Sequence, residues 1–241
     1  MVSGENLNGN SKRMVVLFDS LRKVLIQSGI VIVLFALVGY FFSLQILVFL
    51  RARTGVMLAA FGIPETFIAL LTLSLATGLI AGVPFIFYRI LSELASLFTS
   101  FSRRMLLGFW LSSILLFIGG AAFCLLVTLP YGVRFLLSFK APYLEPVISV
   151  KKFVSFCSLF VFGFGLIFEL PLAMILLARL GLVQAPALAR QRRYAIFGIS
   201  VISAVLTPTP DIFNMSLMGV PLYLLYEIGL VEMRIWHKPR L

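Results

Sequence analysis

Two carboxylate side chains stand inside long apolar runs, and they are the residues of this sequence most able to do chemistry. Glu169 lies in the middle of one run, between Phe168 and Leu170. Hydrocarbon solvates a charge poorly, so a carboxyl group at membrane depth must find a polar partner or bind a proton. Glu169 is therefore either a structural carboxyl hydrogen-bonded to a neighbouring helix or a polar contact on a surface that receives a partner or substrate.

The second carboxylate and the neighbours of the first complete a candidate intramembrane contact site of Glu169, Pro171 and Glu227. Glu227 is expected near the inner end of the last apolar run, where its side chain could snorkel to the membrane surface, and structural and functional roles both stay open. Pro171 follows Glu169 by two residues and predicts a kink in that helix. Gly163 and Gly165 precede it and permit a neighbouring helix to approach closely.

A proline-rich stretch separates the last two apolar runs. Pro208 and Pro210 cannot continue a helix and restrict the residue before each of them, so they predict a tight outer turn. Asp211 follows the second proline and is expected to cap the start of the next helix. A single kinked helix over 194–230 would be about 55 Å long, far beyond a hydrocarbon core of roughly 30 Å, which favours two short helices.

The sequence lacks the residue combinations on which common enzyme active sites depend. The single histidine, His237, lies in the C-terminal tail, which argues against Ser–His hydrolysis and a His-based metal site. Asp19 and Asp211 would fall on opposite sides of a membrane and cannot form an aspartyl protease pair, and no glycine-rich phosphate loop is present. Cys124 and Cys157 have no metal-ligand spacing and read as small apolar residues, with a disulfide between them as the alternative. We expect no catalytic residue, no metal and no cofactor.

The elements that must position these residues are transmembrane helices. Hydrophobic residues make up 61% of the chain and charged residues 12%, against about half and a quarter in a soluble domain. The sequence predicts an all-α integral membrane protein with a single membrane domain over residues 1–241. An interfacial amphipathic helix is expected at 12–23. Six spans are expected, the last two short, at about 24–50, 67–88, 105–129, 153–178, 194–206 and 212–230.

The basic residues indicate how the chain is oriented. The formal net charge is +11, but Lys and Arg stand in small clusters between apolar runs rather than on one solvated face, which argues against nucleic-acid binding. With a cytoplasmic N-terminus, most basic residues fall on the inner side, and an even number of spans returns the C-terminus there. The outer side would carry Arg51, Arg53, Arg134, Lys140, Lys151 and Lys152.

Three segments of the chain carry distinctive motifs. Residues 164–171 read FGLIFELP in the fourth expected span. Arg192-Arg193-Tyr194 leads into LTPTPD at 206–211, and VPLYLLYEIG follows at 220–229. In order and content these segments resemble the TatC family of twin-arginine protein translocases over most of the chain, and the first matches the family pattern F-G-x-x-F-E-x-P.

The resemblance implies a core membrane component of the twin-arginine translocase rather than an enzyme. Such a component binds the twin-arginine signal peptides of folded cargo and nucleates assembly with TatA-type and TatB-type single-span subunits. The expected state is a hetero-oligomer in the bilayer of the bacterial inner membrane, with both termini cytoplasmic. Export would be driven by the proton-motive force.

The chain departs from the family where signal peptides are recognised. Aligning the N-terminal motif and the first cytoplasmic loop puts serine at both positions where the family has glutamate. Serine cannot form the bidentate pair by which a carboxylate holds arginine. Asp19 and Glu93 lie nearby and are candidate replacements. The candidate signal-peptide site therefore comprises Asp19, Ser20, Arg22, Glu93, Ser102, Arg103 and Arg104.

Two alternatives to that function stay open. One is a divergent paralogue that keeps the scaffold but recognises peptides differently. The other is a proton-coupled secondary transporter that uses Glu169 as its proton site. The inverted repeats typical of transporters are not visible in the sequence, which counts against the second.

Overall fold

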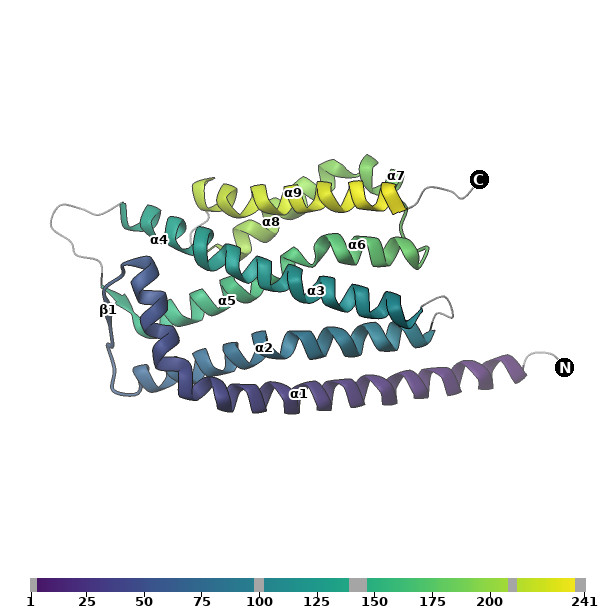
Figure 1. Cartoon of the computed structure of the whole chain (residues 1–241), viewed down its shortest axis with the longest axis horizontal. Helices are drawn as coiled ribbons and strands as arrows, with labels where there is room; N and C mark the ends of the chain where they lie inside the picture. The colour runs from purple at the N-terminus through teal and green to yellow at the C-terminus, as the bar shows by residue number, and fades with distance from the viewer. Residues whose placement is uncertain (1–3, 98–101, 139–146, 208–211, 237–241) are drawn as a thin grey trace.

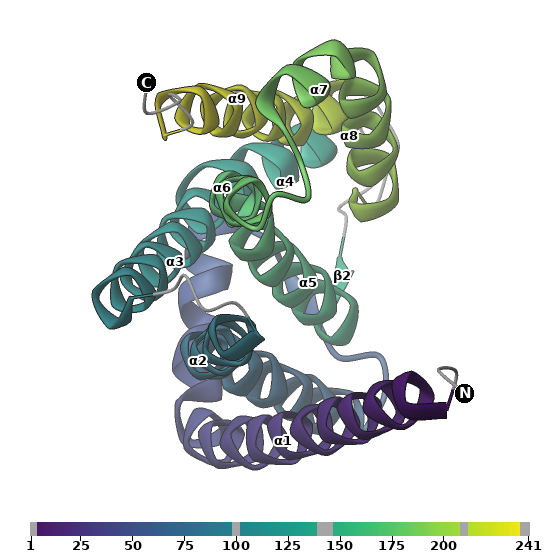
Figure 2. The same ribbon diagram turned by 90° about the vertical axis from the view of Figure 1, so that its right-hand side faces the viewer.

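The computed structural model describes residues 4–97, 102–138, 147–207 and 212–236 of the 241. Within these ranges the chain is almost entirely helical, as its apolar runs predict (Figure 1). The long helices stack from α1 on one side of the molecule to α8 and α9 on the other, and Figure 2 shows this order down the bundle. The bounds of the long elements are α1 Gly4–Thr54, α2 Glu65–Leu97, α3 Arg103–Phe123, α5 Val150–Phe168, α6 Leu170–Arg179, α8 Arg192–Leu206 and α9 Ile212–Trp236.

Shorter elements complete the described chain. A π-helical turn, η1 Cys124–Thr128, and α4 Leu129–Ser138 continue the rod of α3, so the third helical segment extends past the expected end at 129. The helix α7, Ala185–Arg190, lies between the fourth and fifth spans. Two short strands, β1 Leu58–Ala59 and β2 Ile148–Ser149, pair in parallel.

The expected all-α membrane architecture is confirmed. Five helical segments are long and apolar enough to cross a membrane, and α8, with 15 residues, is the shorter sixth helix among the described residues. The start of α1 and the end of α9 lie at the same end of the molecule, as an even number of crossings requires (Figure 1). The helix α9 runs for 25 residues to Trp236, beyond the expected end at 230, because buried Leu230 and Met233 continue its packed face.

The first helix runs without interruption for 51 residues and bends sharply toward its C-terminal end (Figure 1). Residues 12–23, expected as an interfacial amphipathic helix, form part of this helix rather than an element of their own, because no proline interrupts the sequence up to Thr54. Its placement at the membrane surface stays a prediction. The helices α1 and α2 cross closely at Gly78, where a Cβ atom would lie 2.6 Å from the backbone nitrogen of Ala36.

The centre of the bundle is the crossing of α3 with α5. A Cβ atom at Gly120 would lie 2.6 Å from the carbonyl oxygen of Phe164, and one at Gly165 would lie 2.5 Å from the ring of Phe117. Only glycine allows the two helices to come this close. The close approach predicted from Gly165 is therefore confirmed, and fully buried Phe164 packs at the crossing.

At the other end of the bundle, a small clasp joins the α1–α2 connection to the start of α5. The strands pair Leu58 with Ile148 and Ala59 with Ser149. Glu65 accepts hydrogen bonds from the backbone nitrogen of Phe61 at 2.6 Å and from the hydroxyl of Ser149. We call Glu65, Phe61, Ser149 and the two strands the outer clasp.

The two cysteines lie in the packed interior between η1 and α5. Cys124 and Cys157 are both buried, and both are free thiols. The alternative of a disulfide between them is therefore wrong. They act as small apolar residues of the core.

Candidate functional site

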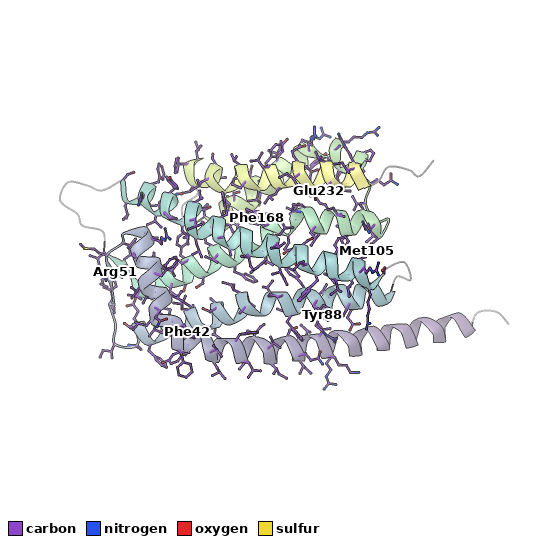
Figure 3. The ribbon with its side chains drawn as sticks, in the orientation of Figure 1. Phe42, Arg51, Tyr88, Met105, Phe168 and Glu232 are labelled. Atoms are coloured by element: carbon purple, nitrogen blue, oxygen red, sulfur yellow. The ribbon has the colours of Figure 1, made fainter. Side chains whose placement is uncertain are left out.

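Glu169 marks a break in the fourth membrane segment, where the residue pattern predicts a kink. It ends α5 and precedes α6, whose first turn contains Pro171. Proline has no backbone N–H, so the helical hydrogen-bond ladder is interrupted at this point. Phe168, which precedes Glu169, lies about midway along the bundle (Figure 3). Glu169 thus lies within the candidate membrane span Val150–Arg179.

The partner of this carboxylate is a serine on α3. The hydroxyl of Ser113 donates to Oε1 of Glu169 at 3.0 Å, and the two side chains are 1% and 8% exposed. A polar hydrogen-bond partner is what hydrocarbon surroundings require. This contact is the one that a structural carboxyl would make, and the role of Glu169 in binding a partner stays a prediction.

A groove opens beside this pair between α3, α6 and α9. Its volume is about 790 Å³. Ser112 and Pro171, each close in sequence to the Ser113–Glu169 pair, belong to its wall. Met105 and Glu232, also in the wall, lie toward the end of the bundle that holds both chain termini (Figure 3). We call this cavity the α3–α6–α9 groove, and its full lining is Arg104, Met105, Gly108, Phe109, Ser112, Leu115, Leu116, Pro171, Leu172, Ile175, Arg179, Leu225, Ile228 and Glu232.

Glu227 lies outside the groove and is paired. Its Oε2 accepts from Nη2 of Arg192 at 2.8 Å, and its Oε1 accepts from the hydroxyl of Tyr223 at 2.9 Å. On the same helix, the hydroxyl of Tyr226 donates to the carbonyl oxygen of Leu188 at 2.9 Å. These contacts join α9 to α7 and α8. A structural role requires contacts of this kind, and a functional role for Glu227 stays a prediction.

The candidate signal-peptide residues lie on segments at one end of the bundle. The N-terminal part of α1, the end of α2 and the start of α3 all lie toward the end where α9 also ends (Figure 1), and the start of α1 lies apart from the other two (Figure 2). Glu93 is partly exposed and pairs with Arg89, with 3.5 Å between Nη2 and Oε1. Asp19 and Ser20 belong to α1, and their side chains fall outside the described part of the structure. The exposed candidates are Arg22, Ser102, Arg103 and Arg104.

The outer turn of Pro208, Pro210 and Asp211 lies outside the described residues. The helix α8 ends at Leu206 and α9 begins at Ile212. Capping by Asp211 stays a prediction.

Several residues of the site could not be identified from the sequence alone. Ser113 does not stand out, because serine occurs at several places in the apolar runs and only the fold selects the one that faces Glu169. The sequence does indicate that Glu169 needs a polar partner on another span, and this requirement narrows the search to the polar residues of the other apolar runs. The groove residues Arg179 and Glu232 do not stand out either, because they lie 53 residues apart in sequence and line the same groove only through packing of α6 against α9.

Comparison with known proteins gives a consistent result. The chain matches the family described as Sec-independent protein translocase protein (TatC) over residues 17–221. It is 32% identical over 215 residues to the Sec-independent protein translocase protein TatC of Carboxydothermus hydrogenoformans, with 88% of each chain covered. It is 33% identical over 216 residues to the TatC protein of Aquifex aeolicus, with 89% of this chain and 88% of that one covered.

A solved structure resembles this fold closely. The crystal structure of a twin-arginine translocase receptor, TatC, superimposes with a TM-score of 0.81 at 31% sequence identity. The match covers 90% of this chain and 98% of that one.

Proposed function

Since the chain belongs to the family of Sec-independent protein translocase protein TatC, we propose that it is the membrane core that receives twin-arginine signal peptides. It is a translocase component rather than an enzyme. In this proposal it lies in the bacterial inner membrane with both termini in the cytoplasm. It nucleates assembly with TatA-type and TatB-type single-span subunits, and the proton-motive force drives export of folded cargo. The observation that carries the proposal is the similarity of fold to a solved TatC receptor over 90% of this chain.

The basic residues support the proposed orientation. Arg22, Arg103, Arg104, Arg179 and Arg192 all lie on segments at the end of the bundle where α1 starts and α9 ends. Cytoplasmic loops of membrane proteins carry an excess of Lys and Arg. That end is therefore the cytoplasmic one in the proposal, and the outer clasp faces the other side.

The signal peptide would bind at this cytoplasmic end. The twin arginines need carboxylates, because carboxylate–guanidinium pairs are charge-assisted and bidentate. Ser20 and Ser102 cannot supply that charge, whereas Asp19 on α1 and Glu93 on α2 can. Glu93 is partly exposed and contacts a guanidinium, that of Arg89, at 3.5 Å, which supports the proposal that it pairs with an arginine of the signal peptide.

The single-span partners would contact the membrane face near Glu169. A buried carboxyl at mid-bilayer is costly, and such residues generally pair within a bundle or mark a functional path. The hydroxyl of Ser113 is the partner within this chain. A polar residue of an incoming helix would add a second one, and this gain would favour assembly.

Export of a reporter tests the proposal. The full chain would be produced together with the single-span subunits of its own source in a bacterium that lacks its TatC protein. A folded reporter with a twin-arginine signal peptide should reach the periplasm, and the same reporter with two lysines in place of the arginines should stay in the cytoplasm. Stable insertion of the chain without export of the arginine reporter would contradict the proposal.

A further inference from the structure

We propose that the α3–α6–α9 groove holds one anionic phospholipid, with its phosphate between Arg104 and Arg179 and an acyl chain along the apolar wall. The lipid belongs to the cytoplasmic leaflet, so the inference rests on the orientation proposed above. Four properties of the groove carry it: its depth, its lining, the charges at its mouth and the way one of these charges is held.

The groove is as deep as one leaflet. On α3 its wall runs from Arg104 to Leu116, which is about 18 Å at the helical rise per residue. On α9 it runs from Leu225 to Glu232, about 10 Å. Half of a hydrocarbon core of roughly 30 Å is about 15 Å. A lipid molecule occupies one leaflet, whereas a partner's transmembrane helix needs a contact face that crosses both leaflets. This groove extends over only the cytoplasmic half of the membrane in the proposed orientation.

The lining suits an acyl chain. Beyond its mouth the wall is mainly apolar, with Leu115, Leu116, Leu172, Ile175 and Ile228 among its residues. At Gly108 the wall is open, because a Cβ atom placed there would meet no atom within 4 Å. Flexible hydrocarbon fills an irregular apolar channel of this kind without leaving a polar group unpaired.

The mouth of the groove carries the charge that a phosphodiester requires. Arg104 on α3 and Arg179 on α6 contribute two positive charges, and Glu232 on α9 contributes one negative charge, which leaves one net positive charge. A phosphodiester carries one negative charge, and basic pockets between transmembrane helices on the cytoplasmic side attract such headgroups. Glu232 can accept a hydrogen bond from a headgroup hydroxyl. Phosphatidylglycerol has both a phosphodiester and hydroxyl groups.

Arg179 is held in place on the groove wall. Its Nη1 donates to Sδ of Met105 at 2.9 Å, and its guanidinium lies 5.3 Å from the ring centroid of Phe109. Both partners belong to α3, so α3 and α6 together position this arginine at the mouth. A positioned guanidinium loses less conformational entropy when it binds a phosphate.

Lipid binding to the purified full chain tests the inference. The chain would be delipidated in detergent, titrated with phosphatidylglycerol, and the bound lipid counted by native mass spectrometry. The double variant Arg104→Gln with Arg179→Gln should bind phosphatidylglycerol on the order of tenfold more weakly, because each basic residue near a membrane surface adds to the attraction of anionic lipid. The control, Arg190→Gln with Arg234→Gln, removes the same charge from exposed positions on α7 and α9, outside the groove lining, and should bind nearly as the unmodified chain does.

A second variant keeps the inference falsifiable if the arginine variant is unstable. Gly108→Leu adds a side chain where the structure has open space, so the fold should tolerate it while the acyl channel is blocked. Bound phosphatidylglycerol should fall in this variant too. Equal losses in the groove and control arginine variants, unchanged binding in Gly108→Leu, or equal affinity for phosphatidylglycerol and phosphatidylethanolamine would each overturn the inference.

The measurement also separates this inference from the proposed function. It uses neither signal peptide nor single-span partner, so lipid binding can fail while export of the reporter succeeds. A photoactivatable acyl chain gives an independent readout: labelling of α3 and α6 near the groove supports lipid occupancy. Capture of a partner's transmembrane helix at Gly108→Cys in the assembled complex would instead assign the groove to protein and overturn the lipid.

Discussion

Ser113 and Glu169, 56 residues apart in sequence, meet through a 3.0 Å hydrogen bond between α3 and the break that separates α5 from α6. The pair lies beside the close helix crossing where Gly120 and Gly165 bring α3 against α5. Close packing fixes the distance between the two helices, and that distance places the serine within reach of the carboxylate. The polar pair and the glycine crossing therefore depend on one another.

Replacing Glu169 should separate assembly from insertion. In Glu169→Ala the carboxyl is lost and a partner's polar residue has nothing to contact, so co-purification of the single-span subunits should fall while membrane insertion is retained. Ser113→Ala keeps the carboxyl and removes one hydrogen bond, worth about 0.6 kcal/mol inside a membrane bundle, so assembly should be much less affected. Normal co-purification with Glu169→Ala would refute the partner role of this residue.

Adjacent glycines on α3 should respond oppositely to the same substitution. In Gly120→Ala the new Cβ atom would lie 2.6 Å from the carbonyl oxygen of Phe164, so the crossing must widen at a cost of about 1–3 kcal/mol. In Gly119→Ala the Cβ atom meets nothing within 4 Å, and alanine favours the helix. Thermal unfolding in detergent should show a lower midpoint for the first variant and an unchanged or higher one for the second. Equal midpoints would contradict the close crossing.

The ion pair between Arg192 and Glu227 should be modest in strength. Its side chains are 46% and 27% exposed, so solvent screens it and its contribution to stability should not exceed about 1 kcal/mol. A double-mutant cycle with Arg192→Gln and Glu227→Gln, measured by thermal unfolding, gives the coupling energy directly. Glu232→Gln serves as the control, because it removes a carboxylate from the same helix without touching the pair. A coupling well above this range would mean that the pair is more shielded than the structure indicates.

Signal-peptide recognition should depend on the carboxylates that stand near the two serine positions. Asp19→Asn combined with Glu93→Gln should weaken crosslinking of a twin-arginine peptide, because the remaining candidates of the site offer hydroxyls or positive charges. Glu232→Gln again removes a carboxylate near the same end and should leave crosslinking intact. Unchanged crosslinking in the double variant would place arginine recognition elsewhere.

The outer clasp should protect the backbone amide of Phe61. The amide of Phe61 donates to Glu65 at 2.6 Å, so Glu65→Ala should speed hydrogen exchange at Phe61 by roughly fivefold for a bond worth about 1 kcal/mol. Amides of the α3–α5 crossing should exchange as before and provide the internal control. Unchanged exchange at Phe61 would show that Glu65 does not hold the clasp.

The helical membrane bundle and the break near Pro171 could be predicted from the sequence, because apolar length and proline chemistry act locally. The end of α9 could not, because Glu232 and Arg234 interrupt the apolar pattern after Leu230, whereas the fold buries Met233 and continues the helix to Trp236. The β1–β2 pairing and the Ser113–Glu169 hydrogen bond could not be predicted from the sequence either. Each joins segments more than 50 residues apart, and nothing in either segment alone specifies its partner.

The helix α8 has a consequence for the lipid that surrounds it. Its 15 residues rise about 22 Å, which is about 8 Å less than a typical hydrocarbon core. Its side chains Phe197 and Val205 are 70% and 76% exposed, so they present a short apolar face to the surroundings. A span this short is matched by thinning of the bilayer, by snorkelling of flanking residues or by oligomerisation, at a cost of fractions of a kcal/mol per ångström of mismatch. Among the described spans, α8 is therefore the one at which thinning or subunit association relieves the largest mismatch.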